Sequence, residues 1–271
     1  MATLSYKKVV LTKTALFLAF SSALFTPYAS SLTAEQKGLE IAEKVENLDS
    51  GWGNAAVSAR MILRNSQGEE SYRDFRINLL EVEGDGDKGL IIFDSPRDIK
   101  GTGLLSYTHA LVADEQWLYL PSLKRVKRIN SNNKSGPFIG SEFSYEDITS
   151  FEVEKFRYKY IRDEEIFGRD AFVQEVYPNY KHSGYKKIVS WIDKERYIPL
   201  KNVYYDRKNQ LLKTQTFSDY KQYKDQFWRA STQVMENHNS GKVTRIEWSD
   251  YKFQIGLTKR NFNISTLKRI K

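Results

Sequence analysis

The chain has 271 residues with 42 Lys and Arg against 34 Asp and Glu, a formal net charge of +8, and it contains no cysteine. The lack of cysteine excludes disulfides, thiol nucleophiles and cysteine-ligated metals. Aromatic residues make up 14% of the chain. Aromatic side chains at that density favour pleated, half-buried strands, which predicts one β domain rather than several small ones.

Residues 1–29 have the pattern that is typical of a secretory signal peptide. Three lysines precede the apolar run TALFLAFSSALF at 14–25, and small residues follow up to Ala29. The run is shorter than the roughly 20 residues that a membrane-spanning helix needs. We therefore expect cleavage near Ala29, a mature domain at 30–271 and a periplasmic location, with a retained N-terminal anchor as the alternative. Without cysteine, a lipid anchor on an N-terminal cysteine is excluded.

Cleavage would leave 39 basic against 34 acidic residues. An exported protein meets little nucleic acid, so we expect no nucleic-acid partner. The moderate positive charge instead suits anionic lipid head groups, which leaves peripheral contact with a membrane open.

The mature chain begins with a predicted helix at 33–49. Thr33 and Gln36 have the spacing of a capping box, and apolar residues then recur at steps of three and four. Gly51 and Gly53 end the helix. Its single apolar stripe predicts that the helix lies on another surface.

Beyond the helix the apolar period changes to two, which predicts short antiparallel strands joined by tight turns. About eleven strands account for residues 56–255. Such a long sheet must curl or close. We predict a mainly β (α+β) fold, a strongly curved, half-open antiparallel β-barrel with the helix over its concave face. Periodicity leaves open whether the interior holds an apolar cavity or is packed like an ordinary sandwich.

Large residues on the inward face of the strands are the candidates for lining such a cavity. They are Phe75, Ile77, Leu79, Trp117, Tyr119, Phe156, Tyr158 and Tyr160.

The motifs that resemble catalytic or cofactor sites do not have the required context. GDGDKG at 84–89 matches a dinucleotide fingerprint, but a strand follows it and its aspartates would repel phosphate. The three histidines are far apart in the sequence, and no serine nucleophile elbow occurs. We therefore predict no catalytic residues, no cofactor and no metal site.

The segment 117–148 combines an aromatic strand, the basic run KRVKR at 124–128 and a glycine-bearing loop. The basic run is either a charged edge strand that discourages edge pairing or a cationic lip that binds an anionic head group. SEFSYEDI at 141–148 suits a short helical lid. The candidates for rim or partner contacts are Lys124, Arg125, Lys127, Arg128, Phe138 and Ile139.

Four motifs in this region resemble the LolA-like family of outer-membrane lipoprotein-sorting proteins. They are S-P-x-D-I-K-G-T at 95–102, D-x-Q-W-L-Y-L-P at 114–121, K-R-V-K-R-I at 124–129 and G-S-x-F-S-Y-E-D at 140–147. The resemblance spans about residues 32–271. It implies a half-open curved sheet with helices as a lid, an apolar concavity and a soluble periplasmic protein that shields acyl chains.

The resemblance implies a carrier or chaperone for a lipid or an acylated lipoprotein, acting toward the outer membrane without catalysis. Relatives of this branch often accompany RND-type (MMPL-like) exporters. A non-enzymatic accessory subunit of such an exporter, docking through 124–146, is therefore an alternative. A lipid-modifying enzyme is a third reading, for which the sequence offers neither nucleophile nor metal site.

Overall fold

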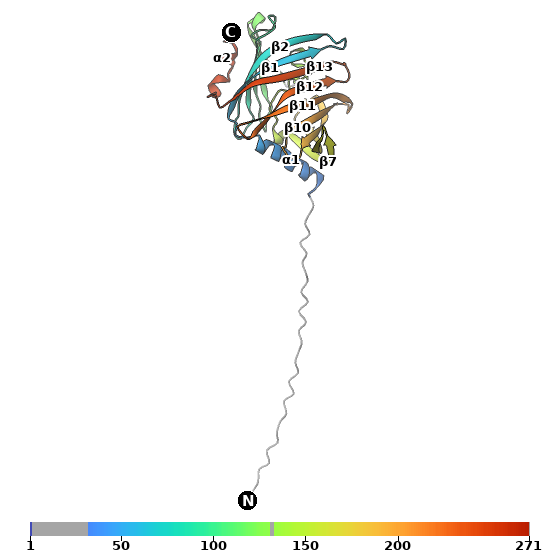
Figure 1. The fold of residues 1–271 in the computed structure, drawn as a ribbon. Coiled ribbons are helices and arrows are strands. Elements are labelled where there is room, and N and C mark those ends of the chain that lie inside the picture. Colours follow the sequence, from blue (N-terminus) through green and yellow to red (C-terminus); the bar gives the residue numbers. More distant parts are fainter. Residues whose placement is uncertain (2–31, 131–132, 271) are drawn as a thin grey trace. The chain divides into compact units, whose positions relative to one another are not determined.

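Thirteen antiparallel strands form one curved, open sheet in the computed structural model, which describes Met1, residues 32–130 and residues 133–270 (Figure 1). The strands are β1 Asn54–Arg64, β2 Glu70–Leu80, β3 Lys88–Phe93, β4 Gly103–Tyr107, β5 Glu115–Leu120, β6 Arg125–Arg128, β7 Phe156–Ile166, β8 Arg169–Pro178, β9 Tyr185–Asp193, β10 Pro199–Asp206, β11 Leu211–Tyr223, β12 Phe227–Asn237 and β13 Val243–Phe253. The signal peptide expected at 1–29 lies, except for Met1, outside the described residues.

The predicted mainly β, half-open fold is confirmed, with two more strands than the expected eleven. The KRVKR run contributes β6, which stands at one end of the strand order. This run is thus a short edge strand, whose positive charges discourage pairing with another chain.

The strand order is β6-β5-β4-β3-β2-β1-β13-β12-β11-β10-β9-β8-β7. β1 and β13, which are the first and last strands in the chain, therefore pair at the centre of the sheet. On each side of this seam the strands form a simple meander. β6 and β7 follow one another in the chain but lie at opposite edges of the sheet. The chain between Arg128 and Phe156 must consequently cross from one edge to the other.

The seam between β1 and β13 is irregular. The register shifts between Ala56 and Ser58, where β13 carries an extra residue, and Asp250 adopts a left-handed backbone with φ 55°. Such a bulge bends a strand and increases its local twist. The irregularity therefore adds curvature where the two halves of the sheet meet.

The predicted N-terminal helix is confirmed as α1 Ala34–Leu48. Thr33 and Gln36 form both hydrogen bonds of the capping box, at 2.8 and 3.1 Å. The helix lies against β7 (Figure 1). A β-carbon at Gly38 would approach the backbone nitrogens of Lys159 and Tyr160 to 2.9 Å, so glycine permits this close contact.

Apolar clusters cover both faces of the β1–β6 half. The inner face carries Met61, Phe75 and Phe93. The outer face carries a second cluster, which the C-terminal residues Phe262 and Leu267 cover. The covering segment contains the short α2 Ile264–Leu267. Strands β3 and β4 are therefore buried on both sides, which explains their continuous apolar runs at GLIIF and GLLSY.

Candidate functional site

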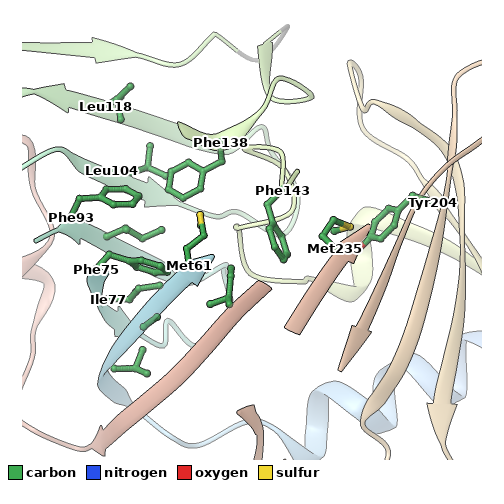
Figure 2. Packing of buried hydrophobic residues seen from close by; sticks show 14 of the residues in the cluster. Met61, Phe75, Ile77, Phe93, Leu104, Leu118, Phe138, Phe143, Tyr204 and Met235 are labelled. Carbon is green, nitrogen blue, oxygen red and sulfur yellow. The ribbon is translucent and has the colours of Figure 1, made fainter. Parts of the chain in front are cut away.

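A segment of the crossing connection fills the inner face of the β1–β6 half. We call residues 136–148 the plug. It contains the 3₁₀ turn η3 Phe138–Gly140, bends at 141–143 and a turn at 145–148, so the short helical lid expected at 141–148 is reduced to that turn. The side chains of Phe138 and Phe143 are 1% and 2% exposed. Figure 2 shows Phe138 facing Phe93, with 5.8 Å between the ring centroids.

A buried ion pair anchors the plug to the opposite half of the sheet. Lys213 Nζ lies 2.5 Å from Asp147 Oδ2 and donates to the carbonyl of Glu142 at 3.1 Å. The hydroxyl of Tyr185 donates to Asp147 Oδ1 at 2.7 Å, and the backbone nitrogen of Ser144 donates to Oδ2 at 2.6 Å. Asp147 therefore has a cation and two neutral donors to satisfy its buried charge.

Glu146 forms the second anchor of the plug. Its carboxylate accepts hydrogen bonds from Gly184 N at 2.8 Å, Ser183 Oγ at 3.0 Å and Tyr180 Oη at 3.1 Å. Burial raises the pKa of Glu146 despite these donors. The polar residues of the G-S-x-F-S-Y-E-D motif thus hold the plug on the sheet.

An open cavity of about 1520 Å³ lies at the end of the sheet beside the C-terminal turn of α1. Its wall is formed by the residues after α1, by the β2–β3 turn and by β10 to β13. Large apolar and aromatic side chains dominate that wall. They are Val45, Leu48, Trp52, Leu79, Phe151, Tyr197, Ile198, Phe217, Tyr220, Trp228, Tyr251 and Phe253.

The same cavity is rich in acidic groups. Its carboxylates are Glu46, Asp49, Glu81, Glu83, Asp85, Asp87, Glu152, Glu154, Glu195 and Asp225. Arg196 and Arg229 are the basic residues among those that line it, and Arg229 is paired with Asp49. No ion pair among the described residues neutralises Glu46, Asp87 or Glu152. The cavity therefore combines an aromatic wall with a strongly negative lining.

Two of these carboxylates have strongly shifted pKa values. Burial raises the pKa of Glu152 to about 7, and repulsion from Asp87 adds to the shift while Lys155 opposes it. Burial likewise raises the pKa of Asp87 to about 6, against a hydrogen bond from Val82 N. Loss of water, together with repulsion from neighbouring carboxylates, therefore favours the protonated form of both groups.

The substitution Glu152→Gln is expected to flatten the pH dependence of stability. Burial raises the folded-state pKa of Glu152 from 4.5 to about 7, so the folded protein favours the protonated side chain. The free energy of unfolding that this group contributes is therefore fully present below about pH 4.5 and is lost as the pH rises through about 7. The facing charges are Asp87, Glu46 and Lys155. Thermal unfolding at pH 5 and pH 8 should show a smaller decrease in midpoint for Glu152→Gln than for the wild type.

The control for this experiment is Glu236→Gln, at an exposed carboxylate on β12 that does not line the cavity. It should retain the wild-type difference between pH 5 and pH 8. An equal decrease in the wild type and in Glu152→Gln would show that ionisation of Glu152 does not affect folding.

A smaller cavity of about 620 Å³ lies beside the plug. Its lining includes the plug residues Ser141, Phe143 and Ser144 together with four basic residues. These are Arg207, Lys208, Lys213 and Lys242. The two cavities therefore carry opposite excess charges.

The structure separates the predicted cavity residues into four groups. Leu79 lines the large cavity, whereas Phe75 and Ile77 are packed in the inner core with the plug. Trp117 and Tyr119 lie on the outer face, packed with the cluster under the C-terminal segment.

The remaining three candidates lie on β7 near α1. Phe156 and Tyr158 pack with Ala42 of the helix. The ring of Tyr160 lies 3.5 Å from Lys37 Nζ. Ligand contacts by the eight candidates remain a prediction.

The predicted rim residues also separate. Arg125, Lys127 and Arg128 are exposed on β6, and Arg128 pairs with Glu115 at 2.7 Å. Lys124 precedes them in a left-handed turn conformation with φ 47°. Phe138 and Ile139 belong to the plug and pack in the inner core. Docking of an exporter at the basic residues remains a prediction.

Sequence reasoning missed most of the cavity wall. Trp52, Trp228 and Tyr251 come from a loop and two different strands, and alternation alone could not show that they meet. The acidic character of the lining was also missed. GDGDKG at 84–89 was considered only as a dinucleotide fingerprint, whereas both of its aspartates line the cavity.

Among the described residues, no group of three or more His, Asp or Glu is arranged to hold a metal ion. None of the described helices has the length and apolarity to span a membrane.

Comparisons with known proteins identify relatives of the same architecture. A family model described as an uncharacterized protein matches residues 85–269. The crystal structure of an outer membrane lipoprotein-sorting protein domain from Vibrio parahaemolyticus is 56% identical, with a TM-score of 0.85. That of a DUF1329 family protein from Desulfovibrio piger is 28% identical, with a TM-score of 0.82. Both alignments cover 87% of this chain and 100% of the other.

A LolA superfamily protein from Nitrosomonas europaea is similar in fold. It is 19% identical with a TM-score of 0.69, over 87% of this chain and 100% of that protein. The search of curated proteins found no match.

Proposed function

The chain belongs to the family of outer membrane lipoprotein-sorting protein domains, and from this premise we propose that it is a periplasmic carrier for the acyl chains of a lipid or lipoprotein. The carrier acts without catalysis and transfers its cargo toward the outer membrane. The observation that supports this function is the open cavity of about 1520 Å³ with its aromatic and aliphatic wall.

The physical basis of binding is removal of hydrocarbon from water. Each buried methylene contributes roughly 0.8 kcal/mol, so one or two long chains against Leu79, Phe217 and Trp228 supply a large part of the binding free energy. The plug already occupies the inner face of the β1–β6 half, so the cavity beside the C-terminal turn of α1 is the space that accepts cargo.

Binding of a fluorescent long-chain alcohol, which carries no charge, tests this function. The wild type should bind the probe, and Leu79→Asn should weaken binding by about tenfold or more. The reason is that an amide without a hydrogen-bond partner in the apolar wall costs about 1–3 kcal/mol. A titration of probe fluorescence measures the dissociation constants.

The matched control is Leu211→Asn, because Leu211 is exposed on β11 and does not line the cavity. This variant should bind the probe like the wild type. Circular dichroism establishes that both variants are folded. A wild-type protein that binds no long-chain probe contradicts the proposed carrier function.

A further inference from the structure

We propose that the large cavity selects an amphiphile with a cationic head group, a primary or quaternary ammonium, over anionic amphiphiles of the same chain length. This inference rests on the proposed function and specifies its ligand class. Hydrocarbon lies against the aromatic and aliphatic wall, and the head group lies among the carboxylates that line the same space.

The lining of the large cavity carries an excess of negative charge. Ten carboxylates and two arginines line the cavity. Some carboxylates already have partners, since Asp49 pairs with Arg229 and Glu195 pairs with Arg169. Glu46, Asp87 and Glu152 form no ion pair among the described residues, although the nearby Lys155 partly offsets the charge of Glu152. An anionic head group would add to this repulsion, whereas an ammonium group would reduce it.

Two arginines of the protein already lie against aromatic rings in this wall. The guanidinium of Arg196 lies 4.5 Å from the ring centroid of Trp228. That of Arg229 lies 5.7 Å from the ring centroid of Phe253 while it pairs with Asp49. The wall thus already holds two cations against aromatic faces, and one of them, Arg229, also pairs with a carboxylate. Aromatic faces beside anions are also the surroundings in which proteins bind quaternary ammonium ligands.

The smaller cavity beside the plug has the opposite excess of charge in its lining. There Arg207, Lys208, Lys213 and Lys242 exceed the acidic residues Glu142 and Asp206. The whole chain also has more basic than acidic residues. The negative lining of the large cavity is therefore a local property of that end of the sheet.

The test compares three twelve-carbon amphiphiles below their micelle concentrations: dodecyltrimethylammonium, laurate and the neutral dodecyl maltoside. Trp52 and Trp228 line the cavity, so the tryptophan fluorescence of the purified protein reports binding. At low salt and pH 8, dodecyltrimethylammonium should bind at least about tenfold more tightly than laurate, and this ratio should fall as salt is added.

Variants identify the groups responsible. The double variant Asp87→Asn/Glu152→Gln should reduce the ratio several-fold by weakening ammonium binding and strengthening laurate binding. Trp228→Leu should weaken ammonium binding more than laurate binding, because it removes an aromatic face without changing the charge. Glu236→Gln, the same change of charge outside the cavity, should leave the ratio unchanged.

Equal affinities for the cationic and anionic amphiphiles, or tighter binding of laurate, would overturn the head-group inference while leaving an acyl-chain carrier intact. If none of the three amphiphiles binds, the carrier function fails and this inference fails with it. If the double variant leaves the ratio of ammonium to laurate affinity unchanged, the head group does not bind at Asp87 and Glu152, and the inference is contradicted.

Discussion

Replacement of Lys213 by methionine is expected to lower the free energy of unfolding by about 3–5 kcal/mol. The side chains of Lys213 and Asp147 are 5% and 3% exposed, and their charged atoms lie 2.5 Å apart. Methionine keeps much of the apolar stem but leaves the carboxylate of Asp147 buried without a cation. The donors from Tyr185 and Ser144 do not replace a positive charge. Urea unfolding followed by tryptophan fluorescence measures the difference.

Two further variants make this experiment specific. The double variant Lys213→Met/Asp147→Asn should recover part of the loss, because no uncompensated charge remains. Arg60→Met breaks the exposed pair with Asp74, 2.8 Å apart, and should cost less than about 1 kcal/mol. If Lys213→Met costs no more than Arg60→Met, the buried pair does not anchor the plug.

Truncation of Phe138 to alanine should lower the free energy of unfolding by about 3–5 kcal/mol through loss of apolar contacts and formation of a cavity. The ring is 1% exposed and packs against Phe93 and Tyr145, with centroids 5.8 and 5.6 Å away. Since the plug also carries the Asp147 anchor, its apolar and ionic attachments should weaken together. Denaturant unfolding and the rate of proteolytic cleavage within 136–148 measure the two effects.

The control for Phe138→Ala is Leu123→Ala, at a side chain that is 53% exposed. It should change stability by no more than about 0.5 kcal/mol. A destabilised Phe138→Ala that is cleaved in the plug no faster than the wild type would mean that the plug stays seated without its largest apolar contact.

Local patterns predicted the elements that local physics determines. The capping-box spacing of Thr33 and Gln36 located the start of α1 to within one residue, because the cap depends on neighbours in the chain. Period-two alternation identified the curved antiparallel sheet. It missed β6 because this strand has four residues, of which three are basic, so it carries almost no apolar signal.

The alternation of apolar residues does not show which segments cover the inner and outer faces of the sheet. Alternation shows that Trp117 and Leu118 point to opposite faces, but not which face is the inner one. Trp117 is packed because residues near Phe262 return over the outer face, a contact separated by more than 140 positions in the sequence. The candidate cavity residues on β5 were therefore chosen from the face that the C-terminal segment covers.

The candidate site was still less accessible to sequence reasoning. Its wall joins Trp52 to Trp228 through the pairing of β1 with β13, which is the contact of greatest sequence separation in the sheet. The raised pKa of Glu152 depends on Asp87, which is 65 positions away. Neither relation has a signature in the residues around each position. The family resemblance predicted an apolar cavity. It predicted neither the position of the cavity beside the C-terminal turn of α1 nor the negative charge of its lining.

The bulge at Asp250 has a consequence for the volume that is available to cargo. The large cavity takes part of its wall from β1 and β2 and part from β11 to β13, so it straddles the junction where that extra residue lies. The ladder that joins the two meanders there has one unmatched residue, and a bulge of this kind increases the local twist of a sheet. A small change of twist at that point would widen or narrow the entrance while both meanders keep their internal hydrogen bonds.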